Sequence, residues 1–83
     1  MEQRELLLAS LHKLHTTELG VERIKRNLSL SVDDVVAWCR KIIQSPSCVV
    51  TRKGKNWYAN TQQVIITINV YSNTIITAHR IKK

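Results

Sequence analysis

Residues 64–80 read VIITINVYSNTIITAHR, and this stretch decides the fold of the 83-residue chain. β-branched residues are frequent in two runs, at 64–70 and 74–81, and polar turn residues separate them, a pattern typical of a β-hairpin. Upstream, residues 48–52 and 56–60 form two shorter runs around the turn Lys53-Gly54-Lys55. Because all these links are short and polar, the sequence predicts four strands in an antiparallel meander.

The register of the last hairpin decides which face of the sheet carries His79. A three-residue loop pairs Ile68 with Ile76 and Ile66 with Ala78, and these apolar residues then share the face that the helices cover. A two-residue loop would bury His79 instead. We expect the three-residue loop, because it buries Ile76 and Ala78. The open face would then carry a polar set: Thr67, Thr77 and His79.

The first half of the chain has the periodicity of three amphipathic helices, predicted at residues 2–15, 17–28 and 32–44. Thr16 or Thr17 is placed to cap the second helix, and Ser31, three residues before Asp34, to cap the third. The third helix should end just before Pro46, because the residue preceding a proline is pushed out of the helical region.

These elements predict an α+β fold, with three N-terminal helices packed on one face of a four-stranded antiparallel β-meander. The length suits one domain, over residues 1–83, with one modest core. No apolar run approaches the roughly 20 residues that cross a bilayer, and the acidic start is unlike a secretory signal. We therefore expect a cytoplasmic protein without membrane contact, in which Cys39 and Cys48 are buried thiols.

The net charge of +7 is unevenly distributed along the chain. Residues 1–47 contain seven Lys or Arg and six Asp or Glu, whereas residues 48–83 contain six Lys or Arg and no acid. A basic surface attracts polyanions, which favours RNA or another nucleic acid, an acidic partner protein or an anionic membrane as the partner. The alternative is a solvated basic surface that keeps a small protein soluble.

Several chemistries find no support in the residue pattern. The chain lacks a Gly-rich phosphate loop, a G-x-S-x-G elbow and zinc-ligand spacing. His12 and His15 are one helical turn apart, but no further ligand stands near them, so we expect no metal and no cofactor. The pair Asp33-Asp34 is explained by helix capping.

The sheet half has the composition of a single-stranded RNA site, because aromatic rings stack on bases while Lys and Arg hold phosphates. The predicted contacts at the rim of the open face are Arg52, Lys53, Lys55 and Arg80, with Trp57 or Tyr58 as the stacking surface. Trp57 is alternatively a packing residue of the core. If RNA is cut by 2′-hydroxyl attack, His79 is the candidate proton-transfer group, with Arg80 or Arg52 at the phosphate.

Four blocks resemble a short bacterial family known as a domain of unknown function, number 3781. They read LHTTELG at 14–20, DVVAWC at 34–39, RKGKNWY at 52–58 and TIITAHR at 74–80. The resemblance covers nearly the whole chain and brings no activity, so no functional residue is carried over from it.

The order of elements is also similar to that of the RelE-like and BrnT-like ribonuclease toxins. This second resemblance implies a metal-independent endoribonuclease, active or degenerate, with His79 and Arg80 on the last strand, and an acidic partner protein or an antitoxin as partner. It rests on layout and is an analogy of fold. The competing hypothesis is a non-enzymatic interaction module that docks on an acidic protein, either as a monomer or as a homodimer formed through the exposed sheet.

Overall fold

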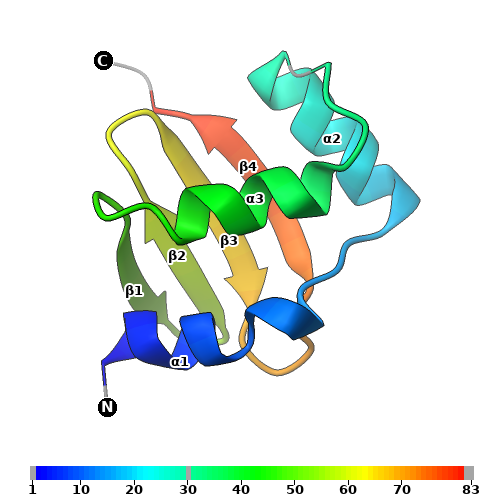
Figure 1. Cartoon of the computed structure of the whole chain (residues 1–83). Helices are drawn as coiled ribbons and strands as arrows, with labels where there is room; N and C mark the ends of the chain where they lie inside the picture. The colour runs from blue at the N-terminus through cyan, green and yellow to red at the C-terminus, as the bar shows by residue number, and fades with distance from the viewer. Residues whose placement is uncertain (1, 30, 82–83) are drawn as a thin grey trace.

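The four predicted strands form one antiparallel sheet in the order β1-β2-β3-β4 in the computed structural model (Figure 1). They are β1 (Val49–Lys53), β2 (Asn56–Asn60), β3 (Val64–Asn69) and β4 (Ile75–Arg80). The structure describes residues 2–29 and 31–81, so positions 1, 30, 82 and 83 of the predicted domain lie outside the described residues. Every strand begins and ends within one residue of its prediction, because alternation and turn residues are both clear in this half.

The helices precede the strands, which confirms the α+β class. They are α1 (Gln3–Ala9), the 3₁₀ turn η1 (Leu11–Lys13), α2 (Glu18–Leu28) and α3 (Val35–Ile43). α1 and α3 cross one face of the sheet, while α2 runs beside β4 (Figure 1). None of the described helices is long and apolar enough to span a membrane.

The first predicted helix, 2–15, is interrupted. α1 stops at Ala9, and Ser10 leaves the helical region with φ −104° and ψ 5°. The chain continues as η1 and then as extended backbone at Leu14, where ψ is 134°. The break redirects the chain so that the N–H of Ile75 donates to the carbonyl oxygen of His15 at 2.7 Å, a contact that a continuous helix would not make. Leu7, Leu11 and Leu14, spaced as on one face of a helix, are nonetheless all buried.

The third helix begins three residues later than predicted, because Asp34 rather than Ser31 is its N-cap. The Asp34 carboxylate accepts a hydrogen bond from the N–H of Ala37 at 3.0 Å. A carboxylate at this position also complements the positive end of the helix dipole. For α2, the prediction of a threonine cap is confirmed: the Thr17 hydroxyl accepts from the N–H of Gly20 at 3.0 Å.

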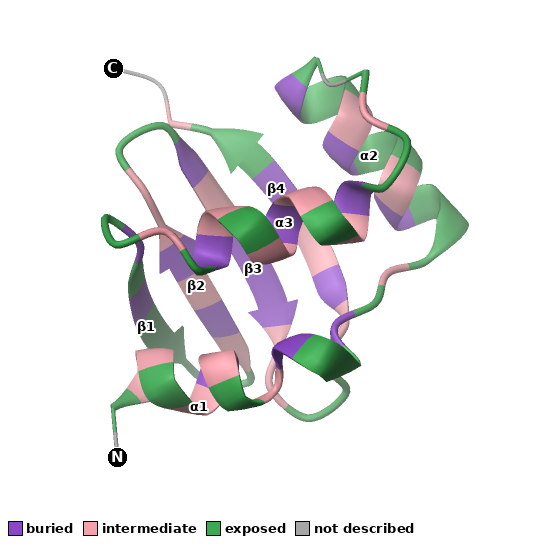
Figure 2. Ribbon diagram, in the orientation of Figure 1, coloured by how far each residue is buried: buried purple, intermediate pink, exposed green. Residues whose placement is uncertain are grey.

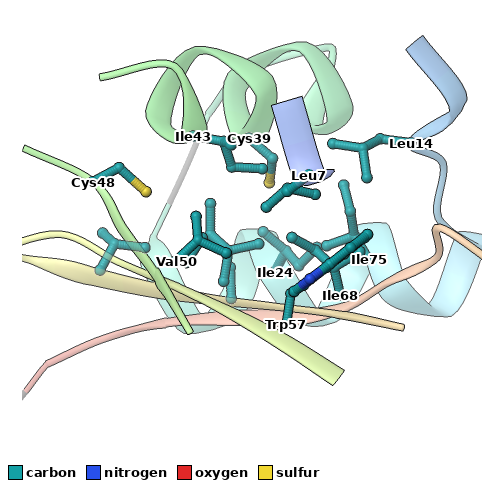
Figure 3. Packing of buried hydrophobic residues seen from close by; sticks show 14 of the residues in the cluster. Leu7, Leu14, Ile24, Cys39, Ile43, Cys48, Val50, Trp57, Ile68 and Ile75 are labelled. Atoms are coloured by element: carbon teal, nitrogen blue, oxygen red, sulfur yellow. The ribbon is translucent and has the colours of Figure 1, made fainter. Parts of the chain in front are cut away.

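The core lies between the sheet and the helices (Figures 2 and 3). Its largest fully buried side chains are Leu7, Ile24, Leu28, Ile43, Ile66, Ile68, Ile75 and Cys39. Every described helix contributes to one contiguous cluster with the inner face of the sheet. Both cysteines are buried in it, as predicted.

β4 carries an irregularity that changes one predicted pairing. Ile66 pairs with Ala78 as predicted, but Ile68 pairs with Ile75 rather than Ile76, because the ladder shifts between Thr67 and Ile68. A bulge places an extra residue in one strand, so the alternation of faces is reset there. Ile75 is therefore the core residue, and Ile76 is only half-buried.

Candidate nucleic-acid interface

The β1–β2 turn and the β3–β4 loop lie at the same end of the sheet (Figure 1). We call this region, residues 52–56 and 69–74, the hairpin end. The N–H of Val70 donates to the carbonyl oxygen of Lys55 at 2.8 Å, which ties the two connections together. An antiparallel meander always brings its first and third connections to one end, so the topology creates this neighbourhood.

The hairpin end combines cations with an exposed aromatic ring. Arg52 Nη2 donates to the hydroxyl oxygen of Tyr71 at 3.3 Å, and its guanidinium carbon lies 5.9 Å from the centroid of the tyrosine ring. Tyr71 is 71% exposed. Lys53 and Lys55 are also exposed, on either side of Gly54, whose φ of +62° suits a tight turn.

The loop that carries Tyr71 is held by the side chain of Asn69. Its Oδ1 accepts from the N–H of Tyr71 at 2.9 Å and from the N–H of Ser72 at 3.0 Å. An Asx side chain that bonds backbone ahead of it fixes a turn locally. The ring of Tyr71 is thus presented from an ordered turn, which lowers the entropy lost when a ligand stacks on it.

His15 reaches the same loop from the helical half. Its Nδ1 donates to the carbonyl oxygen of Lys13 at 3.0 Å, and its Nε2 lies 3.1 Å from the hydroxyl oxygen of Thr74. That hydroxyl lies 2.8 Å from the hydroxyl of Ser72. From the sequence, His15 was considered only as a weak metal ligand, and Tyr71 was given no role. No pattern in the neighbouring residues indicates that either side chain lies near the basic turn at 53–55.

Within residues 8–79 the chain matches the family model described as "Protein of unknown function (DUF3781)". The chain belongs to the DUF3781 family. No curated protein and no solved structure matches it.

Two predicted site residues of this DUF3781 chain take part in the packing of the fold. Trp57 is 4% exposed, and its indole Nε1 donates to Gln3 Oε1 at 3.0 Å, so its ring is a core residue. Arg80 pairs with Val64 on the side of the sheet that the helices cover, and its Nη2 donates to the carbonyl oxygen of Leu28, the last residue of α2, at 3.0 Å. Such a contact satisfies a free carbonyl at a helix C-terminus.

His79 is exposed, as the preferred register predicted, and it stands opposite Ile65 on the open face. Arg52 was predicted at the rim of the open face, but it pairs with the core residue Trp57 and therefore lies on the covered face of the first strand, in a different cross-strand row from His79. The two residues lie three strands apart across the sheet and three residues apart along it. Standard strand spacing and rise then put their backbone positions roughly 17 Å apart. The structure therefore does not bring the predicted proton-transfer group together with the hairpin-end cations.

The open face itself is mostly uncharged. One cross-strand row contains four hydroxyl side chains, from Thr51, Tyr58, Thr67 and Thr77. Tyr58 is half-buried between its neighbours in this row, so less of its ring is free than that of Tyr71. In the β1–β2 hairpin of this DUF3781 chain, the cations thus lie at the hairpin end rather than across the open face.

Three other features, a pocket away from the hairpin end, the potential metal ligands and a buried thiol, offer less to a polyanion than the hairpin end does. A pocket of about 280 Å³ at the opposite end of the sheet is lined by uncharged residues: Ile42, Ser45, Ser47, Thr61, Gln62 and Gln63. No group of three or more His, Cys, Asp or Glu that could hold a metal occurs among the described residues. Burial raises the pKa of the Cys39 thiol to about 12, which disfavours the reactive thiolate.

Proposed function

We propose that this protein binds single-stranded RNA at the hairpin end without cutting it. The observation that carries the proposal is the exposed ring of Tyr71 beside Arg52, with Lys53 and Lys55 on the adjoining turn. Residues 48–83 contain no acid that would oppose an approaching phosphate chain from this half of the sequence. Aromatic rings interleaved with cations suit a strand whose bases are unpaired.

The proposed contacts divide between base and backbone. Arg52 lies near the ring of Tyr71, and together they form a platform on which one base can stack. The ammonium groups of Lys53 and Lys55 sit on long side chains and act as point charges that follow the phosphates. Recognition of this kind depends on salt and tolerates many base sequences.

The proposal is limited to binding because the hairpin end lacks His79, and both ring nitrogens of His15 are already engaged, by the carbonyl oxygen of Lys13 and the hydroxyl of Thr74. A general base must lie within hydrogen-bond reach of the proton that it removes, and His79 stands roughly 17 Å from Arg52 by the strand spacing and rise. The catalytic role of His79 stays a prediction, and His79→Ala tests it. Under the proposal this variant binds RNA as the parent does, and the RNA stays intact with both proteins.

The test is fluorescence anisotropy of a labelled oligouridine RNA 12 nucleotides long, titrated at several salt concentrations. Two phosphate contacts, from Lys53 and Lys55, predict a slope of log K against log salt of about −1.4, since each contributes about −0.7 on a single strand. Tyr71→Ala should weaken binding about tenfold, as loss of one stacking platform does. Lys53→Gln and Lys55→Gln should each weaken binding and flatten the slope.

Lys41→Gln is the matched control, because Lys41 is an exposed lysine on α3 and lies outside the hairpin end. It removes the same charge and should leave the salt slope almost unchanged. Equal losses for Lys41→Gln and Lys55→Gln would mean that RNA senses only net charge, and the proposed site would be wrong. Absence of binding at low salt would reject RNA as the ligand.

A further inference from the structure

The two edge strands of the sheet, β1 and β4, differ in whether other parts of the chain bind their outward backbone groups. At β4, the N–H of Ile75 donates to the carbonyl oxygen of His15 at 2.7 Å, and the carbonyl oxygen of Ile75 accepts from the Thr16 hydroxyl at 2.8 Å. Further along, Asn27 Nδ2 donates to the carbonyl oxygen of Ala78 at 3.3 Å. α2 and the segment before it therefore satisfy this edge, which closes it to another strand.

β1 forms the other edge and stays open. It pairs with β2 on one side, and no described strand pairs with its other side. Four of its five residues are exposed, and Val49 is 60% exposed. Most of β1 accordingly has the colour of exposed residues in Figure 2. The two-residue turn is closed by the pair Lys53–Asn56, so the alternation of an antiparallel ladder directs the N–H and C=O of Arg52 away from β2.

We infer that β1 accepts an extended acidic segment of a partner protein as a fifth, antiparallel strand. Backbone hydrogen bonds supply affinity in this mode, and side chains at the edge supply specificity. Arg52 and Lys53 lie at the edge, and Lys55 follows in the turn. Opposite charges on neighbouring strands stabilise pairing, so carboxylates on the incoming strand complement this edge.

The same charges disfavour a second copy of this chain as the occupant. Two β1 strands paired antiparallel would place Val49 and Val50 of one copy opposite Lys53 and Arg52 of the other, so the basic side chains would meet no carboxylate. Basic side chains on an edge strand are a known device against self-pairing. The inference goes beyond RNA binding and does not depend on it, although both ligands would contact Arg52.

The expected partner sequence follows from the register. Read from its N-terminus, an antiparallel partner strand places acids opposite Lys53 and Arg52, then β-branched residues opposite Thr51 and Val49. Lys53 and Arg52 project to opposite faces, so consecutive acids are needed to meet both. A capped peptide with the sequence SEEVTVTS meets these requirements and serves as the probe.

The experiment titrates this peptide into the isotope-labelled protein and follows amide chemical shifts. The largest shifts are expected along 49–53. A peptide with lysines in place of the glutamates, and one with N-methyl groups on the amides that face β1, should bind at least tenfold more weakly, since each loses charge pairing or a backbone hydrogen bond.

Two substitutions of Arg52 separate the contribution of the backbone hydrogen bond to peptide affinity from the contribution of the charge. Arg52→Ala and Arg52→Pro remove the same cation, but only the proline also removes the outward N–H. Arg52→Pro should bind the peptide about tenfold more weakly than Arg52→Ala, the effect of one lost hydrogen bond. Both should bind RNA equally, so failure of the RNA proposal and failure of this one are distinguishable.

Equal peptide affinities for a folded Arg52→Pro and for Arg52→Ala would overturn the inference. If Arg52→Pro does not fold, the N-methylated peptide decides: unchanged affinity overturns the proposal, and loss of affinity supports it. Concentration-dependent dimerisation that Arg52→Pro abolishes would assign the edge to a second copy and also overturn it.

Discussion

Trp57 shows at the scale of one residue how burial decides what an aromatic side chain does. The ring is 4% exposed, and its indole N–H is bonded to Gln3. We expect Trp57→Phe to lower the free energy of unfolding by about 1–2 kcal/mol, through the lost hydrogen bond and the smaller ring. Urea denaturation measures this loss.

Tyr58→Phe is the control for Trp57→Phe, because it removes a polar atom from the neighbouring aromatic residue on the open face. It should change stability by less than about 0.5 kcal/mol. A similar cost for both substitutions would contradict the assignment of Trp57 to the core.

Cys39 provides a prediction on pH. Burial raises the pKa of its thiol from 9.0 to about 12. Above pH 9 the unfolded chain releases this proton while the folded chain keeps it, so the stability that is present below pH 9 is lost as pH rises toward 12. One proton corresponds to a slope of about −1.4 kcal/mol per pH unit.

The measurement compares unfolding free energies of the parent and Cys39→Ala between pH 8 and 11. Lysines and tyrosines also titrate in this range, so the difference between the two proteins isolates the thiol. Parallel curves would show that Cys39 does not contribute. In the same range of conditions the folded protein should resist alkylation at Cys39, since the thiolate is the reactive form.

At the scale of elements, α3 shows how capping selects a helix start. Two candidate caps, Ser31 and Asp34, precede the same apolar stripe, and the structure uses Asp34. Asp34→Ala should cost about 1 kcal/mol of stability, whereas Ser31→Ala should cost little. Thermal unfolding of both variants provides the comparison, and the reverse order would restore the start predicted from the sequence.

β4 illustrates where sequence patterns fail for an element. Alternation from 64 to 70 predicted Val64, Ile66, Ile68 and Val70 on the covered face; the first three are buried, and Val70, which follows the end of β3, is half-buried. The same alternation chose Ile76 over Ile75, because a bulge leaves no local signal in a run of β-branched residues. The exposure of His79 was still predictable, since Ala78 keeps the expected pairing beyond the bulge.

At the scale of the whole molecule, positive charge divides between folding and ligand binding. Arg40 donates to the carbonyl oxygens of Leu11 and Leu14 at 3.0 and 3.2 Å, and Arg4 donates to that of Ser45 at 3.3 Å. Together with Arg80, these arginines tie helix ends to other parts of the chain. Three of the thirteen Lys and Arg residues thus serve the packing of helices.

This division predicts opposite effects for two substitutions that remove one charge each. Arg40→Gln should lower stability by about 1–3 kcal/mol, because two carbonyl groups lose a charged donor, and should leave RNA affinity nearly unchanged. Lys55→Gln should weaken RNA binding with little effect on stability. Paired anisotropy and urea titrations test both. If Arg40→Gln weakened RNA binding as much as Lys55→Gln, RNA affinity would depend on the net charge of the protein and not on the hairpin end.

The sequence by itself determined the four strands, the three apolar helical stripes and the burial of both cysteines, because alternation, periodicity and turn residues are local properties. Only the tertiary structure decided that Tyr71 stands with Arg52 and that Arg80 faces α2. Both pairs of residues come from distant parts of the chain. Arg52 and Tyr71 meet because the meander brings its first and third connections to the same end of the sheet, and Arg80 meets α2 because that helix lies beside β4. The placement of charge depends on these long-range contacts, which local patterns do not record.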